Sequence, residues 1–242
     1  MGTRVALVVL GLVAMACKDH GAVPGSTPPG AAHDGHSDNT HQMHQMHQMH
    51  HRFEDAETWA KRFDDPSRDA WQKPDAVTAS LGLSPSDVVA DVGAGTGYFA
   101  VRLAKAVPDG KVFASDVEPD MVRYLGERAR RDGIANLVAV QGKADDPALP
   151  EPANLVLLCN VAHHIGDRVA FFGRIRSQLA ANGRIVIVDF KPDAPDDAPG
   201  PPKAHRLAAA ALTAELERAG FVLAGADHEL LPYQYVLQFR LR

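Results

Sequence analysis

The chain has 242 residues, of which 45% are hydrophobic and 23% are charged, values typical of a globular protein. This composition excludes a wholly disordered chain, a collagen and a disulfide scaffold. The formal net charge of −5 argues against a nucleic-acid partner, because proteins dedicated to that task are usually basic. Cys17 and Cys159 are the two cysteines, so at most one intramolecular disulfide can form.

The first sixteen residues are similar to an export signal. Arg4 supplies a positive charge, and residues 5–16 (VALVVLGLVAMA) form an unbroken apolar run. A membrane-spanning helix needs about 20 apolar residues, whereas a signal peptide needs an apolar stretch of this shorter length. A buried N-terminal helix is the weaker alternative, because the following residues are rich in Gly, Pro and His. The sequence therefore predicts a signal peptide over residues 1–16 and an exported protein.

Two kinds of cleavage site fall on the same bond. Ala14-Met15-Ala16 is an A-x-A site for signal peptidase. Cys17 follows it directly and resembles the lipobox cysteine of bacterial lipoproteins, although Ala14 stands where that pattern has Leu. Both interpretations place the mature protein outside the cytoplasm, either periplasmic or anchored to a membrane. We favour the lipoprotein, in which a lipidated Cys17 provides the membrane anchor and leaves Cys159 without a disulfide partner.

Residues 17–52 are predicted to form a disordered tether, because they hold too few large apolar side chains to offset chain entropy. Eight of the twelve histidines lie before residue 52, among them a tandem His-Gln-Met repeat. Imidazole binds Cu(II), Zn(II) and Ni(II), and thioether sulfur selects Cu(I), so the repeat favours copper. A polar spacer that binds no metal is an equal alternative. The candidate metal ligands are His41, Met43, His44, Met46, His47, Met49, His50 and His51.

Residues 53–242 have the composition of one folded domain. Its first part, interrupted by Pro66 and Pro74, is predicted to form one or two helices that could cover the core. Strands are then predicted over 87–92, 111–115, 137–141, 154–159, 184–190, 221–230 and 235–241, and helices over 98–106, 119–132, 167–180 and 207–219. This alternation predicts a doubly wound α/β fold with a parallel sheet. The last two strands should be antiparallel, because the link around Pro232 is too short for a parallel crossover.

The turn after the first strand carries the main chemical signal. It reads Asp91-Val-Gly93-Ala-Gly95-Thr-Gly97-Tyr98. Glycines let a backbone approach a ligand closely, and the start of the next helix offers unpaired N–H groups. A dinucleotide fingerprint needs glycine at the sixth position of G-x-G-x-x-G, where this chain has Tyr98. An NAD-dependent oxidoreductase is therefore a weaker hypothesis.

The motif from Asp91 to Gly97 resembles motif I of the class I S-adenosylmethionine-dependent methyltransferases, over residues 87–190 and more loosely beyond. The resemblance implies a Rossmann-like sheet of seven strands, mostly parallel with an antiparallel C-terminal strand, and S-adenosylmethionine as methyl donor. One departure is Asn154, which opens the fourth strand where the family usually has Asp and which we expect to anchor structure. The cofactor-binding residues that the resemblance implies are Asp91, Gly93, Gly95, Gly97, Asp116, Val117, Asp145 and Asn160.

Among these, the resemblance gives separate tasks to two acidic residues. Asp116 ends the second strand and would hold both ribose hydroxyls, and Asp145 would face the adenine amine. For Asp145 a simple turn formed with Asp146 and Pro147 is the alternative.

Candidate catalytic residues lie at the carboxyl ends of the fourth and fifth strands, where ligands bind in doubly wound sheets. They are His163, His164 and Asp189. A general base is needed only if the acceptor loses a proton, and adjacent histidines that start a helix cannot both face the pocket. Trp71 and Tyr98 could cover the cofactor. The proline-rich residues 191–202 are interpreted as a loop over the substrate mouth or a plain surface loop.

The leading hypothesis is an exported, membrane-tethered enzyme that transfers a methyl group from S-adenosylmethionine to a small-molecule acceptor. The fourth strand is followed by Asn160-Val-Ala-His163-His164 rather than by Asn-Pro-Pro-aromatic, which argues against DNA amino-methylation. The alternative is an exported copper-binding or metal-binding lipoprotein with a non-catalytic methyltransferase-like domain. Export itself favours that alternative, because S-adenosylmethionine is made in the cytoplasm.

Overall fold

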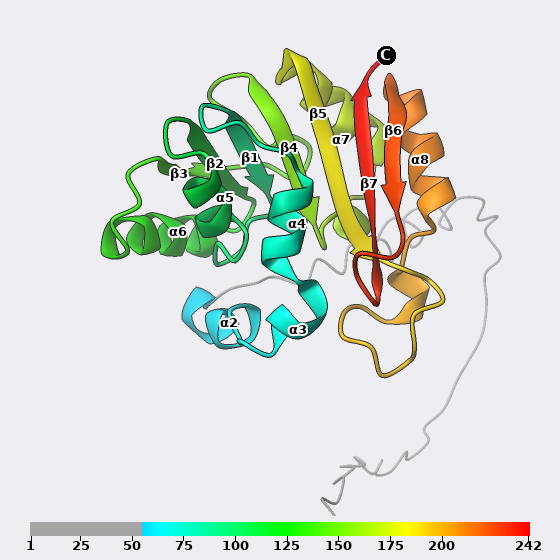
Figure 1. Ribbon diagram of the computed structural model, residues 1–242, viewed down its shortest axis with the longest axis horizontal. Coiled ribbons are helices and arrows are strands. Elements are labelled where there is room, and N and C mark those ends of the chain that lie inside the picture. Colours follow the sequence, from blue (N-terminus) through cyan, green and yellow to red (C-terminus); the bar gives the residue numbers. More distant parts are fainter. Residues whose placement is uncertain (1–54) are drawn as a thin grey trace, which may run out of the picture. The chain divides into compact units, whose positions relative to one another are not determined.

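Seven strands form one sheet in the computed structural model, which describes residues 55–242 (Figure 1). The strands are β1 (Val88–Val92), β2 (Lys111–Asp116), β3 (Leu137–Gln141), β4 (Ala153–Cys159), β5 (Leu179–Phe190), β6 (Phe221–Asp227) and β7 (Gln234–Leu241). Their order across the sheet is β3-β2-β1-β4-β5-β7-β6. β1 to β5 are parallel, and β7 is antiparallel to β5 and β6. The predicted sheet is confirmed, including the antiparallel C-terminal pair.

Helices cover both faces of this sheet, as expected for a mostly parallel sheet. They are α2 (Ala56–Phe63), α3 (Arg68–Gln72), α4 (Pro74–Ser80), α5 (Ala100–Ala106), α6 (Pro119–Arg131), α7 (Arg168–Ser177) and α8 (Ala209–Arg218), with short 3₁₀ turns η1 (Ala162–His164) and η2 (Lys203–His205). α4, α5 and α6 pack on one face and α7 and α8 on the other (Figure 1).

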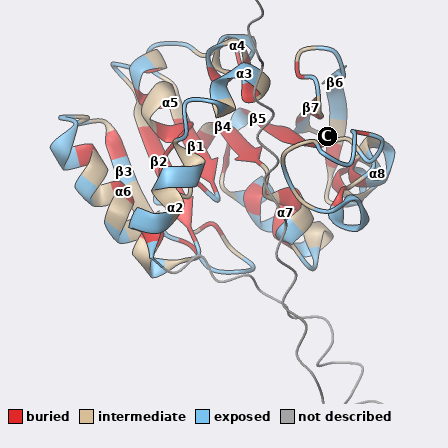
Figure 2. Cartoon of the chain, turned by 90° about the horizontal axis from the view of Figure 1, so that it is seen from below, coloured by how far each residue is buried: buried red, intermediate tan, exposed pale blue. Residues whose placement is uncertain are grey.

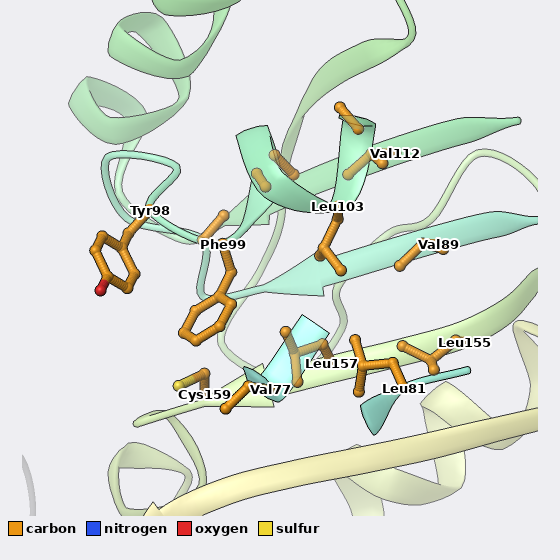
Figure 3. Packing of buried hydrophobic residues seen from close by; sticks show 14 of the residues in the cluster. Val77, Leu81, Val89, Tyr98, Phe99, Leu103, Val112, Leu155, Leu157 and Cys159 are labelled. Carbon is orange, nitrogen blue, oxygen red and sulfur yellow. The ribbon is translucent and has the colours of Figure 1, made fainter. Parts of the chain in front are cut away.

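Each face of the sheet has its own hydrophobic core. On the first face Leu103 of α5 and Val77 of α4 pack against Val89 and Leu157 of the central strands (Figure 3). On the second face Phe172 of α7 belongs to a cluster of buried residues from α7, α8 and the strands. The central strands are therefore buried on both sides (Figure 2), which explains their continuous apolar sequences.

The first part of the domain contains three helices rather than one or two. α2 and α3 are separated by a link that holds Pro66, as predicted from the interruption there. Pro74, however, begins α4 at its first helical position, where the missing N–H of proline costs nothing. The prediction read Pro74 only as a break, so it missed α4.

The end of α7 also differs from the prediction. A helix was expected over residues 167–180, but α7 ends at Ser177 and β5 already begins at Leu179. Leu179 pairs with Ala153, and the register then shifts before Arg184 pairs with Leu155. Glycine at position 183 suits this irregular pairing, because a Cβ there would lie 2.8 Å from the Ala153 carbonyl oxygen. The prediction was wrong because Asn-Gly marks a strand irregularity here, not a helix end.

The predicted signal peptide (residues 1–16), Cys17 and the tether with its His-Gln-Met repeat lie outside the described residues and stay predictions. Within residues 55–242, no helix has the length and apolar character needed to cross a membrane.

Candidate active site

The glycine turn between β1 and α5 has a backbone that few other residues could adopt. Gly93, Gly95 and Gly97 all have positive φ angles, of 71°, 56° and 92°. A Cβ on Gly93 would overlap the side chain of Val161, and a Cβ on Gly97 would lie 2.9 Å from Leu125. The turn is therefore both left-handed and tightly enclosed, which only glycine permits.

Asp116 lies at the end of β2, directly beside this turn. Its carboxylate accepts hydrogen bonds from the backbone N–H of Gly95 at 2.8 Å and of Glu118 at 3.0 Å. The residue is only 8% exposed, and burial raises the pKa of its carboxyl group above the ordinary value. The next residue, Val117, is 52% exposed. An acceptor group and an apolar surface thus lie side by side at this end of the sheet.

Asp91, at the end of β1, is a buried carboxyl group. It is 3% exposed. Burial, and then the charge of Asp116, raise the pKa of Asp91 to about 7, whereas the charge of Arg68 and the backbone N–H of Ala100 oppose that rise. A carboxylate kept in such surroundings favours a cationic ligand strongly.

The loop after β3 separates the roles of its two aspartates. Asp146 forms the turn, since its carboxylate accepts hydrogen bonds from the Ala148 N–H at 2.8 Å and from the Gln178 amide at 2.6 Å. Asp145 is exposed, and no hydrogen bond or ion pair engages it within the described part of the chain. The turn expected as the alternative for Asp145 is therefore made by Asp146, which leaves Asp145 available to a ligand.

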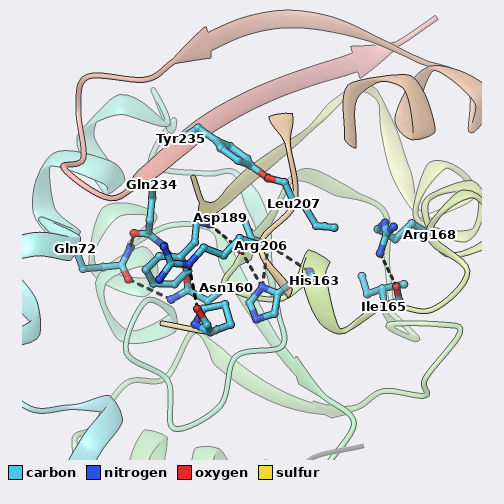
Figure 4. A network of polar contacts seen from close by, with 12 residues as sticks. Gln72, Asn160, His163, Ile165, Arg168, Asp189, Arg206, Leu207, Gln234 and Tyr235 are labelled. Atoms are coloured by element: carbon cyan, nitrogen blue, oxygen red, sulfur yellow. Dashed lines mark hydrogen bonds and ion pairs between the residues drawn. The ribbon is translucent and has the colours of Figure 1, made fainter. Parts of the chain in front are cut away.

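Three side-chain amides form a closed ring of hydrogen bonds at the end of β4 (Figure 4). Gln72 donates to the carbonyl oxygen of Gln234 at 2.5 Å, Gln234 donates to that of Asn160, and Asn160 donates to that of Gln72 at 3.2 Å. Gln72 and Gln234 are fully buried. Asn160 itself has a positive φ of 62°. This amide ring joins α3, the end of β4 and the start of β7.

His163 and Asp189 form a buried pair beside the amide ring (Figure 4). Nδ1 of His163 lies 2.8 Å and 3.1 Å from the two carboxylate oxygens of Asp189, and the two side chains are 4% and 0% exposed. His164 is exposed, although its ring lies 4.2 Å from the ring of His163, centroid to centroid. His163 is thus the histidine that packs inside, and His164 is the one exposed to solvent.

Residues 55–73, called here the covering segment, lie against the glycine turn (Figure 1). The ring of Phe63 would be 3.5 Å from a Cβ on Gly95. Asp64 pairs with Arg128 of α6 at 2.9 Å, and the Arg128 guanidinium also donates to the carbonyl oxygen of Thr96 at 2.7 Å. The covering segment is thus attached to the glycine turn through Arg128 and contacts it through Phe63.

Tyr98 provides a second attachment for the covering segment. Its hydroxyl donates to Asp69, and its ring stacks with the guanidinium groups of Arg68 and Arg102, whose Cζ atoms are 3.9 Å and 4.4 Å from the ring centroid. The pKa of the Tyr98 hydroxyl is raised, mainly by burial and then by its hydrogen bond to Asp69. Trp71 packs against Phe190 at the end of β5, with ring centroids 5.9 Å apart. Both aromatic residues therefore hold the covering segment in place.

The predicted proline-rich segment (residues 191–202) continues through η2 to Arg206, and residues 191–206, called here the proline-rich loop, pack against the end of β5. The buried Arg206 guanidinium donates to the carbonyl oxygens of Pro201 at 3.0 Å and of Ala194 at 2.8 Å. A Cβ on Gly200 would overlap the ring of Phe190. The loop is therefore held against Phe190 at the end of β5, next to Asp189.

Sequence reasoning missed Arg68, Gln72, Arg206 and Gln234. Gln234 follows a Pro-Tyr pair in a turn and carries no motif. Gln72 and Arg68 belong to Arg-Asp-Ala-Trp-Gln, in which polar residues recur at helical spacing beside a tryptophan. That spacing could have indicated that one helical face bears both polar and aromatic groups, but not that it turns inward.

Among the described residues, three buried polar side-chain atoms near the glycine turn have no hydrogen-bond partner. They belong to Arg68, Thr96 and Arg128. Thr96 lies in the glycine turn, Arg128 donates to its carbonyl oxygen, and Arg68 stacks on Tyr98. Buried polar groups are normally paired. No group of three or more His, Cys, Asp or Glu residues within 55–242 is placed to hold a metal ion.

Comparison with known proteins agrees with this arrangement. The family described as "Methyltransferase domain" matches residues 83–225. A probable ribosomal RNA small subunit methyltransferase A of Methanosarcina barkeri is 35% identical over 97 residues, which cover 40% of this chain and 32% of that protein. A ubiquinone/menaquinone biosynthesis C-methyltransferase of Cupriavidus taiwanensis is 29% identical over 116 residues, which cover 46% of each chain. The chain spans less than half of the length of these curated relatives.

A solved structure matches a larger share of the chain. The S-adenosylmethionine-dependent methyltransferase from Aquifex aeolicus is 25% identical, with a TM-score of 0.70 over 76% of this chain and 98% of that one. The sheet order, the glycine turn and the family match over more than half of the sequence all indicate a methyltransferase domain. The chain belongs to the family of methyltransferase domains and has the α/β fold of the S-adenosylmethionine-dependent enzymes.

Proposed function

We propose that the protein is an S-adenosylmethionine-dependent methyltransferase that acts on a small-molecule acceptor. The observation that carries the proposal is the joint placement of the glycine turn, Asp91 and Asp116 at one end of the sheet. This end lies where β1 and β4 are neighbours and the strand order reverses, which is where doubly wound folds bind ligands. The match to the solved methyltransferase supports the same donor.

The residues present fit this methyl donor. When bound, S-adenosylmethionine supplies a methyl carbon activated by its sulfonium. The carboxylate of Asp116 would accept from both ribose hydroxyls, and exposed Val117 would contact the adenine, near Asp145. Asp91 would favour the ammonium group, and Asn160 lies at the other side of the same turn, next to Val161 that packs on Gly93.

His163 and Asp189 have the geometry of a general base. In the tautomer whose Nδ1–H donates a hydrogen bond to the Asp189 carboxylate, Nε2 of His163 is the nitrogen that can take a proton from an acceptor. The buried carboxylate then stabilises the imidazolium that forms. The pair therefore favours an acceptor that loses a proton on methylation, such as a hydroxyl group.

The negative charge of the proline-rich loop disfavours nucleic acid as the acceptor. Asp193 and Asp197 are exposed on the proline-rich loop, and they would repel a phosphodiester backbone. The ribosomal RNA methyltransferase among the relatives shows that family membership alone does not fix the acceptor. The quinone-pathway relative agrees better with a small molecule.

The proposal is tested by incubating the full chain with methyl-tritiated S-adenosylmethionine and a panel of catechols, hydroxyquinols and other phenols, with total RNA as a separate arm. Label transferred to a phenol by the wild type, and not by the Asp116→Ala variant, is the expected result. Transfer to RNA alone would contradict the small-molecule acceptor. A chain that binds S-adenosylmethionine yet labels nothing would support the non-catalytic alternative.

We propose further that the chain is an exported lipoprotein anchored through Cys17. The support is the apolar run that ends in Ala14-Met15-Ala16 directly before Cys17. Lipoproteins carry several acyl chains, which anchor far more firmly than one. The wild type should fractionate with membranes, and Cys17→Ala should release an exported soluble protein. An intact Met1 terminus on a protein found in the cytoplasm would contradict this proposal.

We also propose that the His-Gln-Met repeat binds copper, and a copper-binding lipoprotein without turnover is the second candidate function. One observation favours it, the alternation of imidazole and thioether ligands over residues 41–51. A peptide of these residues should compete for Cu(I) better than a peptide with every His and Met replaced. Equal competition would make the repeat a spacer. Deleting the repeat should leave binding of S-adenosylmethionine intact.

A further inference from the structure

Arg68 places a positive charge inside the candidate site. Its guanidinium donates to the carbonyl oxygen of Phe63 at 2.9 Å and to the side-chain oxygen of Gln72 at 3.3 Å. The ring of Tyr98 lies 3.9 Å from its Cζ atom, and stacking of this kind fixes the plane of a guanidinium group. The cation is therefore held by the covering segment and by the last residue of the glycine turn.

The hydrogen bonds of Arg68 leave part of its donor capacity unused. A guanidinium has five N–H donors, and its Nε is buried without any hydrogen-bond partner. A buried N–H donor without a hydrogen-bond partner destabilises the fold. None of the described acidic side chains forms an ion pair with Arg68 within 4.0 Å. The structure thus offers a half-buried guanidinium that is held in place, has a buried Nε and forms no ion pair with the described residues.

The charge of Arg68 acts on the ends of the two central strands. It lowers the pKa of Asp91 at the end of β1 and that of Cys159 at the end of β4, in both cases against the larger effect of burial. β1 and β4 are hydrogen-bonded neighbours. The charges of Arg68 and Asp91 therefore act on one another, yet no hydrogen bond or ion pair connects the two side chains among the described residues.

An amino-acid group matches this pair of charges. The methionyl tail of S-adenosylmethionine carries a carboxylate and an ammonium on one carbon, so it needs an anion and a cation a few ångströms apart. We propose that Arg68 binds the α-carboxylate of this tail, and that the covering segment thereby selects ligands with an intact amino-acid group. The inference rests on the proposed function only in that S-adenosylmethionine is the ligand.

A guanidinium is well suited to this task, because its planar fork donates two parallel hydrogen bonds to a carboxylate. The competing interpretation is that Arg68 only holds the covering segment closed through Phe63 and Gln72. Arg102 is a matched control for that interpretation. It also stacks on Tyr98, donates to the Tyr98 carbonyl oxygen at 2.8 Å, and pairs with Asp69 of the covering segment at 3.3 Å.

The test measures dissociation constants of the full chain for S-adenosylmethionine and for decarboxylated S-adenosylmethionine, which lacks only the carboxylate. The wild type should bind the intact ligand at least tenfold more tightly. Arg68→Gln should weaken binding of the intact ligand at least tenfold and binding of the decarboxylated ligand less than twofold. Arg102→Gln should change the preference between the two ligands less than twofold. Arg68→Lys, which keeps the charge but not the fork, should lose part of the preference.

Other results would overturn the inference. A wild type without preference between the two ligands contradicts it, even if Arg68→Gln fails to fold. Equal losses for both ligands in Arg68→Gln would assign Arg68 to holding the covering segment. Tighter binding of the intact ligand by that variant would show that the Arg68 guanidinium obstructs the ligand instead of binding it. A wild type that binds neither ligand refutes the proposed function itself, whereas the preceding results refute only the role of Arg68.

Discussion

Replacing Asp91 by Asn should make the ligand-free protein more stable and should weaken its binding of S-adenosylmethionine. Asp91 is 3% exposed, and burial and the charge of Asp116 raise its pKa from 3.8 to about 7. Asn has nearly the same shape and can still accept the hydrogen bond from the Ala100 N–H. The substitution therefore removes a buried charge and little else.

The magnitude follows from the pKa. One pH unit of displacement corresponds to 1.36 kcal/mol, so an ionised Asp91 costs the folded state about 4 kcal/mol above pH 7. Between pH 3.8 and about 7 the folded state binds more protons than the unfolded state, so the contribution of Asp91 to stability falls as pH rises. Asp91→Asn should be more stable than the wild type by about 2 kcal/mol at pH 5 and by about 4 kcal/mol at pH 8.

Urea denaturation of the full chain at several pH values between 5 and 8 measures this difference. Asp75→Asn is the control, because the Asp75 side chain is 95% exposed and an exposed pair contributes about 0–1 kcal/mol. A stability difference for Asp91→Asn that is constant with pH, or of opposite sign, would refute the reasoning about burial.

The same variant should lose affinity for S-adenosylmethionine, because a neutral amide attracts an ammonium group less than a carboxylate does. For the wild type, that affinity should fall as pH drops below about 7 and Asp91 becomes protonated. Unchanged affinity in Asp91→Asn would remove Asp91 from the cofactor site.

Three further substitutions test other parts of the account. In thermal unfolding, Gly93→Ala should destabilise the fold by more than Gly133→Ala. Both residues have positive φ, which costs an alanine about 1–2 kcal/mol. Of these two sites, only Gly93 has other atoms where the new Cβ would lie. Gln72→Leu should lower the free energy of unfolding in urea by about 2–4 kcal/mol, because it leaves amide groups of Asn160 and Gln234 unpaired; no loss would show that the amide ring is dispensable. His163→Ala should lower kcat about 10²–10⁴-fold with unchanged affinity for S-adenosylmethionine, and His164→Ala should have a much smaller effect; the reverse order would exchange their roles.

The strands were the most predictable part of the fold. β3 was predicted at its observed bounds, and β1, β2 and β4 within one residue, because buried parallel strands are short apolar runs between turn residues. Asn154 was expected to anchor structure, and its side chain accepts a hydrogen bond from the Val88 N–H at 2.8 Å. Local pattern and turn chemistry sufficed for these features.

The site was predictable only where a motif marks it. Gly93, Gly95, Gly97 and Asp116 lie together as the motif implies. The pairing of His163 with Asp189 joins residues 26 positions apart, and no local spacing specifies it. The predicted strands placed both residues at the carboxyl ends of neighbouring strands, but they did not specify the contact between the two side chains.

The covering segment was the least predictable. Arg68 and Gln72 turn inward because Tyr98, Asn160 and Gln234 meet them from distant parts of the chain. Such polar contacts between elements leave no periodic signal in a single sequence. The beginning of β5 was missed for a related reason, since its pairing with Ala153 is a tertiary contact that overrode a local helix pattern.

Isothermal titration of the purified full chain with S-adenosylmethionine and with NAD tests the central claim most directly. We predict that one equivalent of S-adenosylmethionine binds and that NAD does not. Asp116→Ala should weaken this binding strongly, because two charge-assisted hydrogen bonds of about 1.5–3 kcal/mol each are lost. Binding of NAD in place of S-adenosylmethionine, or wild-type affinity in Asp116→Ala, would contradict the account.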